Sequence, residues 1–276
     1  MTRTHSVARP PETGRPKDAL VALSRPGPHP VLRGDLGMVG IPGVVFAPAE
    51  GLGLPAVVFG HDWLQPVERY ADLLRHLASW GIVAAAPDSH RGALPSHSGF
   101  AADLRTTLEV CTGVRLGDDG KISVDVRRTA YAGHGIGGGA ALVAAAGHTR
   151  VYALVTIAVA QTHPSALDTA RSITVPTLHI AAGKDTVVPV SGHAEPIAAA
   201  AGGPVWLRTL TKASHSGFLD GSHWSDFVLT GGPDAKTRRV TRALVTAFLL
   251  NQLCDESRTE LLVTGDVPGT VLHQRP

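Results

Sequence analysis

Short apolar runs alternate with amphipathic stretches along most of this chain. Five of the runs are mostly apolar and only a few residues long: residues 56–59, 82–86, 151–159, 174–181 and 205–210. Runs of this kind are typical of strands that a parallel sheet buries on both faces. We therefore expect these segments to be strands of one sheet.

Between these runs lie stretches with helical spacing. In residues 67–80, for example, Tyr70, Leu73, Leu74 and Leu77 recur at the interval that places them on one helix face. The predicted helices cover residues 67–80, 101–112, 140–146, 194–201 and 237–253. Strands that alternate with helices imply right-handed crossovers, so the pattern predicts an α/β fold: a mostly parallel sheet of about eight strands with helices on both faces.

The ends of the chain have a different composition. Residues 1–30 are rich in Pro and Arg and lack periodicity, which predicts a flexible N-terminal leader. Residues 31–47 read as two antiparallel strands that turn around residues 40–43. We find no internal repeat or linker, and we expect a single domain over residues 31–254, followed by a C-terminal tail over residues 255–276.

Composition narrows the classes of partner. The net charge over 276 residues is +2 and no dense Lys/Arg block occurs, so we infer no nucleic-acid partner. No apolar run approaches the length of about 18 residues that a membrane span needs, and no apolar signal segment opens the chain. We expect Cys111 and Cys254 to be free thiols in a cytoplasmic protein, with a disulfide between them as the open alternative. The sequence does not indicate an oligomeric state.

The most informative stretch is residues 131–140, Tyr-Ala-Gly-His-Gly-Ile-Gly-Gly-Gly-Ala. A strand-like run precedes it and an Ala/Leu-rich run follows, which predicts a strand, a tight turn and a helix. The turn matches the nucleophile elbow G-x-S-x-G at every position except the serine, which is Gly135. We expect Gly135 at the apex of the turn in a left-handed or otherwise strained conformation, with Gly133 and Gly137 allowing close backbone approach.

Two further residues follow predicted strands downstream of the elbow. Asp185 comes after one strand and His215 after the last, in the order elbow, acid, histidine. A carboxylate bonded to one ring nitrogen would orient the imidazole and leave its other nitrogen as a base. We expect the two side chains within hydrogen-bond reach, with His215 facing empty space above Gly135. Taken singly, each also fits a turn residue or a solvated loop side chain.

Three segments carry a resemblance to a known family. Residues 77–83, 133–139 and 185–190 resemble polyester hydrolases and cutinase-like enzymes of the dienelactone-hydrolase branch of the α/β-hydrolases, over about residues 31–250. The resemblance implies an α/β-hydrolase fold of ester-hydrolase ancestry. We expect no cofactor. It also implies triad positions at Asp185 and His215, and an oxyanion hole made by the backbone amides of Ile136 and Trp63.

The sequence departs from the family pattern in three places. Gly135 removes the nucleophile. Asp62 stands where the family usually has glycine, and its carboxylate would oppose a developing negative charge if it pointed inward. The family's aromatic Trp-His pair is matched by Thr162 and His163, so one aromatic face is lost.

Other residues near the predicted strand ends suggest further kinds of site. We expect the site to be lined by four residues: His61, Asp62, His134 and His163. No H-x-H or H-x-x-x-H spacing occurs among the histidines, so we predict no metal site. The elbow also matches the dinucleotide-binding pattern G-x-G-x-x-G in part. The acid and the histidine downstream favour a degenerate elbow over a dinucleotide site. Residues 220–236 are polar and read as a flap near His215, or as a plain surface loop.

Three functions follow, in order of preference. The first is a non-catalytic or very weak hydrolase homologue that binds a small apolar or ester-like ligand. The second is an enzyme that uses the His215–Asp185 pair as general base on water or on a substrate proton. The third is an ordinary serine esterase whose serine has been replaced by glycine.

Overall fold

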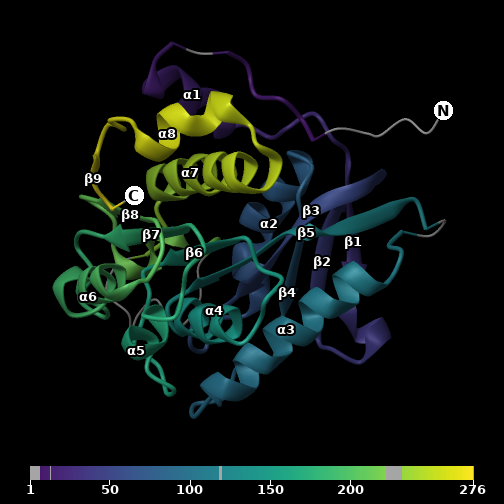
Figure 1. The fold of residues 1–276 in the computed structure, drawn as a ribbon, viewed down its shortest axis with the longest axis horizontal. Coiled ribbons are helices and arrows are strands. Elements are labelled where there is room, and N and C mark those ends of the chain that lie inside the picture. The colour runs from purple at the N-terminus through teal and green to yellow at the C-terminus, as the bar shows by residue number, and fades with distance from the viewer. Residues whose placement is uncertain (1–6, 13, 118–119, 222–231, 276) are drawn as a thin grey trace.

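The chain forms one nine-stranded mixed sheet in the order β1-β2-β4-β3-β5-β6-β7-β8-β9 (Figure 1). The structure is a computed structural model and describes residues 7–12, 14–117, 120–221 and 232–275. The strands are β1 (Val31–Asp35), β2 (Gly43–Pro48), β3 (Gly51–Gly60), β4 (Val83–Pro87), β5 (Ile122–His134), β6 (Ala153–Ile157), β7 (Thr177–Ala182), β8 (Val205–Leu210) and β9 (Thr270–Arg275). From β4 to β8 neighbouring strands pair in parallel, whereas β1, β2 and β9 pair antiparallel at the two edges. The predicted mostly parallel α/β sheet is confirmed.

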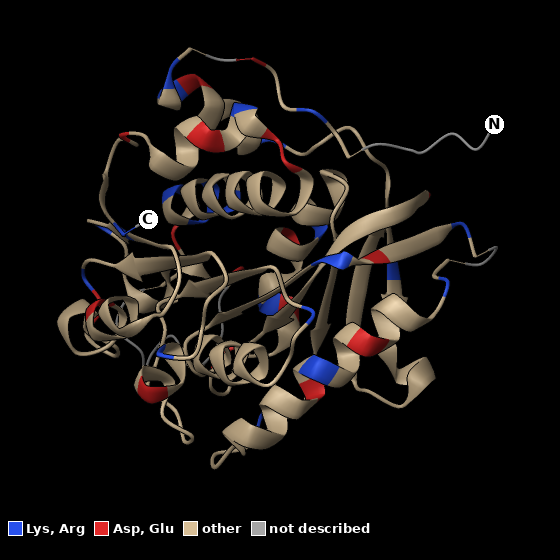
Figure 2. Ribbon diagram, in the orientation of Figure 1, with Lys and Arg blue, Asp and Glu red and all other residues tan. Residues whose placement is uncertain are grey.

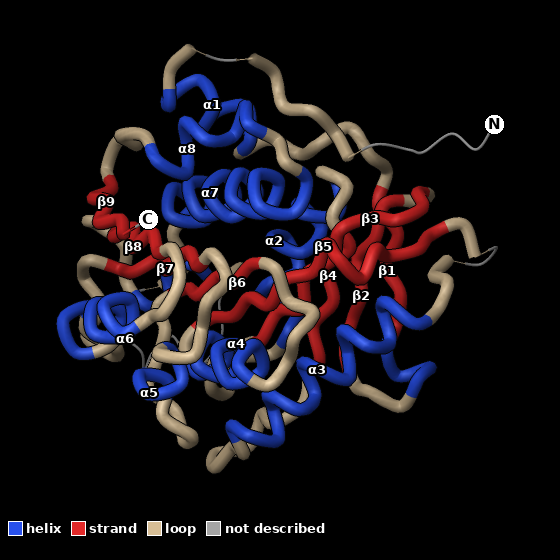
Figure 3. Tube along the Cα trace, in the orientation of Figure 1, coloured by secondary structure: helices blue, strands red, loops and turns tan. Residues whose placement is uncertain are grey.

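Helices cover both faces of this sheet (Figures 1 and 3). They are α1 (Pro16–Leu23), α2 (Ala71–Ser79), α3 (His97–Gly113), α4 (Ile136–Ala146), α5 (Ala166–Ala170), α6 (Ala194–Ala200), α7 (Ala235–Cys254) and α8 (Glu260–Thr264). Leu74 of α2 and Phe248 of α7 belong to one buried apolar cluster, and Phe100 of α3 and Ala140 of α4 belong to the other. α2 and α7 therefore bury their apolar residues on one side of the sheet, and α3 and α4 bury theirs on the other.

Two predicted elements differ from the structure near the N-terminus. The predicted leader contains α1, in which Leu20 and Leu23 are buried and which packs against α7. An eight-residue helix offers too few apolar repeats for its period to be recognised. The predicted helix over residues 67–80 divides into a 3₁₀ turn, Val67–Tyr70, and α2.

The predicted C-terminal tail is also part of the fold, because α8 and β9 both lie within it. Arg208 on β8 holds this segment in place. Its buried guanidinium donates to the hydroxyl of Thr270 on β9 and to the carbonyl oxygens of Leu262, Val263 and Gly265, at 2.9–3.1 Å.

Replacing Arg208 by alanine is expected to lower the free energy of unfolding by about 3 kcal/mol, since several buried carbonyl groups lose a charged donor. Urea denaturation measures this. Arg33→Ala, at an exposed position of β1, is the matched control and should change the value by at most about 0.5 kcal/mol. Equal effects of the two variants would contradict the assigned role of Arg208.

Charged residues of the two signs are not segregated in this structure (Figure 2). Basic and acidic positions are interspersed over the helices and loops (Figure 2). Within the described residues, no helix has both the length and the apolar character that crossing a membrane requires. Most of the predicted 220–236 flap, residues 222–231, lies outside the described part of the chain.

Candidate active site

The turn between β5 and α4 has the geometry of a nucleophile elbow. Gly135 lies at its apex with φ 52° and ψ −120°, a conformation that side-chain-bearing residues rarely adopt. A Cβ on Gly133 would lie 2.3 Å from the carbonyl oxygen of Gly137, and one on Gly137 would lie 2.2 Å from that of Gly60. The predicted strand, turn and helix, the strained apex and the close approach are therefore all confirmed.

The predicted acid–histidine pair is also formed. Asp185 follows β7, and His215 begins a 3₁₀ turn (His215–Phe218) after β8. Nδ1 of His215 lies 2.8 Å from Oδ2 of Asp185, and both side chains are buried. The other carboxylate oxygen, Oδ1, accepts the backbone N–H groups of Val187 and Val188 at 2.9 Å each. These bonds fix the carboxylate, and the carboxylate fixes the imidazole.

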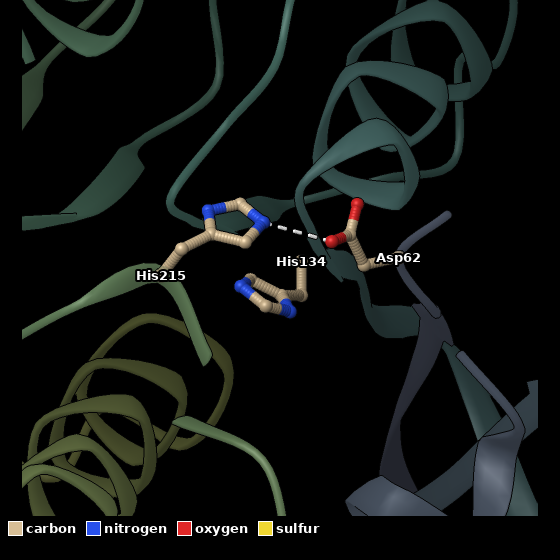
Figure 4. Close-up of side chains that lie close together, drawn as sticks. All are labelled: Asp62, His134 and His215. Carbon is tan, nitrogen blue, oxygen red and sulfur yellow. Dashed lines mark hydrogen bonds and ion pairs between the residues drawn. The ribbon is translucent and has the colours of Figure 1, made fainter. Parts of the chain in front are cut away.

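Asp62 occupies the position where the serine side chain of an elbow would begin. Its Oδ2 lies 2.8 Å from Nε2 of His215 (Figure 4). Its Oδ1 accepts the backbone N–H of Ile136 at 3.0 Å. A Cβ built on Gly135 would lie 1.7 Å from that Oδ1. The prediction that His215 faces empty space above Gly135 is therefore wrong, because the Asp62 carboxylate fills that space. Asp62 points inward, which is the orientation that opposes a developing oxyanion.

The two contacts of His215 make it a buried cation between carboxylates. Burial opposes the charged imidazole, but hydrogen bonds and charge from Asp185 and Asp62 outweigh it and raise the pKa of His215 to about 10. For Asp62, burial favours the neutral acid. The hydrogen bond to His215 and the charge of that ring outweigh burial and hold the pKa of Asp62 well below its usual range. At neutral pH the arrangement is carboxylate, imidazolium, carboxylate.

The imidazole nitrogens of His215 are expected to show the imidazolium signature in NMR spectra at pH 8. The raised pKa means that His215 stabilises the fold fully below about pH 6.5, and that this contribution is lost as the pH rises through about 10. Asp62→Asn removes one of the two charges and should lower the titration midpoint. A midpoint near 6.5 in the parent protein would contradict the ion-pair assignment.

Two buried neighbours, His134 and Tyr70, lie next to this arrangement. The ring of His134 lies 4.8 Å from that of His215, centroid to centroid, and burial lowers its pKa to about 4, so it is neutral. The hydroxyl of Tyr70 accepts the backbone N–H of Asp62 at 3.0 Å and lies 2.9 Å from Nδ1 of His134. The Tyr70 hydroxyl therefore links the backbone of Asp62 to the ring of His134. Tyr70 was not predicted as a site residue, because its helical spacing marked it only as a core residue.

The remaining predicted site residues have other contacts. Trp63 is 39% exposed, and its indole N–H donates to the carbonyl oxygen of Ala93 at 3.2 Å. The ring nitrogens of buried His61 lie 2.8 and 2.7 Å from the carbonyl oxygens of Asp62 and Ser89. His163 is exposed in the loop after β6, where its backbone N–H donates to His97. Of the predicted lining residues, Asp62 and His134 lie at the site.

Within the part of the chain that the structure describes, Asp62, His134 and His215 form a group that could hold a metal ion, since one ligand atom from each lies within 4.8 Å of the others. Two ligands of a tetrahedral zinc ion lie about 3.3 Å apart, given bonds of about 2.0–2.1 Å. The 2.8 Å contact between Asp62 and His215 is shorter than that. The described arrangement therefore fits a proton shared by an ion pair better than a cation between ligands.

The parallel sheet, the elbow after β5, and an acid and a histidine after β7 and β8 define an α/β-hydrolase. The family model for PET hydrolase-like proteins matches residues 53–218, more than half of the chain. The chain therefore belongs to the PET hydrolase-like family. It is also 28% identical, over 194 residues, to cutinase est1 of Thermobifida alba; the match covers 69% of this chain and 64% of that relative.

Proposed function

We propose that this chain is a PET hydrolase-like protein in which the serine route to ester hydrolysis is closed. The observation that carries the proposal is the Asp62 carboxylate in the place of the serine side chain. Position 135 lacks a hydroxyl, and Oδ1 of Asp62 already binds the Ile136 amide on which an oxyanion would depend. The loss of a triad nucleophile alone lowers turnover about a millionfold.

The family supports a small ester-like molecule as the kind of ligand such a site takes. Exposed Trp63 and Val187 follow the carboxyl ends of β3 and β7, so an apolar ligand could approach along this edge of the sheet. The predicted cytoplasmic location and the predicted lack of a cofactor stay predictions.

The two other candidate functions have less support. A general base needs a free lone pair, whereas both ring nitrogens of His215 are engaged with carboxylates and the ring is protonated at neutral pH. A serine esterase changed only at position 135 would have had no room for the Asp62 carboxylate in its present position. The absence of a side chain at Gly135 leaves the space that the Asp62 carboxylate occupies. This match favours two linked departures from the family pattern over a change at position 135 alone.

A panel of nitrophenyl esters with short to medium acyl chains tests the proposal. We expect the parent protein to hydrolyse them at rates within about twofold of a His215→Gln variant, since neither protein has a serine route. Clear ester turnover that His215→Gln abolishes would overturn the proposal.

A further inference from the structure

We propose that Asp62 is a covalent nucleophile toward small alkyl halides, with His215 and Asp185 completing the hydrolysis of the alkyl-aspartate ester. The inference rests on the proposed function in one respect: Asp62 stands where the serine hydroxyl would. It goes beyond that function because it assigns an activity to the residues that remain.

The carboxylate is placed as a nucleophile would be. Its low pKa keeps it ionised, and Oδ1 is held by the Ile136 amide while Oδ2 meets Nε2 of His215. An inert salt bridge would need only the contact with His215. The contact of Oδ1 with the amide after the elbow is the additional feature, since it aligns the Asp62 carboxyl group with an oxyanion donor.

The leaving group determines the substrate class. A carboxylate is a weak base, and it displaces only groups that are weaker bases still, such as halides, rather than the alkoxide of an ester. In the first step Oδ2 forms a bond to the alkyl carbon, the carbon–halogen bond breaks, and the halide leaves with the electron pair. The alkyl group would lie toward the apolar edge of the site, where Trp63 and Val187 are exposed and Ile136 is partly buried.

Alkylation then changes the charge next to His215. Esterified Asp62 is neutral, so the imidazolium loses one of its two anionic partners and releases its proton to solvent more readily. Water gives one proton to Nε2, and its oxygen adds to Cγ of Asp62. The oxyanion forms on Oδ1, which faces the Ile136 amide. Collapse expels the alkoxide, which takes the other water proton and leaves as the alcohol. The Asp62 carboxylate and the His215 imidazolium are then restored, and each turnover yields one alcohol, one halide and one proton.

The test uses 1-bromobutane and the full chain. We expect bromide release by the parent protein at least about 10²-fold above that of Asp62→Asn. In His215→Gln, intact-protein mass should rise by one butyl group, and peptide mapping should place it on Asp62 rather than on Cys111 or Cys254. Asp185→Asn is the matched second variant, with the same nucleophile and a poorly oriented base, and should also accumulate the adduct.

A single turnover of the parent protein in ¹⁸O-water decides the route without any variant. The nucleophile route places ¹⁸O in Asp62 and none in the butanol, whereas His215 acting on water directly would place it in the butanol. The proposal is overturned by ¹⁸O in the butanol, or by the absence of both bromide release and an Asp62 adduct. Neither result bears on the proposal that the serine route is closed, because the panel of nitrophenyl esters tests that proposal separately.

Discussion

Serine at position 135 is expected to restore ester hydrolysis only when Asp62 is replaced as well. In the parent structure, the Cβ of a residue at 135 would lie 1.7 Å from Oδ1 of Asp62. The buried carboxylate cannot move aside freely, because it is bound to His215 and to the Ile136 amide. Gly135→Ser alone should therefore either distort the site or destabilise the fold, without gaining activity.

Asp62→Gly combined with Gly135→Ser removes the obstruction and frees both His215 and the amide. The backbone at 135 already has the strained conformation of an elbow apex, which costs a side-chain-bearing residue on the order of 1–3 kcal/mol. The nucleophile of an intact triad raises turnover about a millionfold. We expect the double variant to recover part of this and to hydrolyse nitrophenyl butyrate at least about 10²-fold faster than the parent. The two substitutions should be strongly non-additive.

Asp62→Gly combined with Gly135→Ala is the matched control, since it opens the same space and carries the same backbone strain but lacks a hydroxyl. Comparable activity in the two double variants would show that serine is not the source. Activity in Gly135→Ser alone would show that Asp62 does not block the position.

Asp62→Ala is expected to lower the free energy of unfolding by about 3 kcal/mol at pH 7, because removing one partner leaves a buried cation short of a counter-charge. The effect should shrink as the pH rises toward about 10, where His215 loses its proton in the folded protein. Denaturant titration at several pH values measures both.

A double-mutant cycle of Asp62→Asn with His215→Gln separates the pair from the loss of each residue alone. Asparagine and glutamine keep hydrogen-bonding groups of similar shape without charge. We expect a coupling free energy of about 1.5 kcal/mol or more. Additive effects would mean that the 2.8 Å contact contributes no net ionic stabilisation.

The sequence was sufficient to predict the elbow and the acid–histidine pair. Their signals are local: glycines at fixed spacing in a strand–turn–helix pattern, and single polar residues just after apolar runs. The apolar runs also predicted that the sheet is mostly parallel. β9 was missed because its sequence, Thr270–Arg275, is an exposed edge strand without an apolar run.

The arrangement of Asp62 could not be read from the sequence. Its direction depends on the space left by Gly135, on the position of His215 beyond it, and on the Tyr70 hydroxyl that binds its backbone N–H. These residues lie on separate elements, and no local pattern joins them. The sequence placed Asp62 beside the oxyanion donors, and only the fold shows that it takes the place of the nucleophile.

A fluorophosphonate probe, which labels activated serines, tests most directly whether the serine route is closed. The parent protein and the Asp62→Gly, Gly135→Ser double variant would be treated side by side and analysed by intact mass and peptide mapping. We expect no adduct on the parent and one adduct, on the introduced serine, in the double variant. An adduct on any serine of the parent, including Ser214 or Ser216 beside His215, would contradict this expectation.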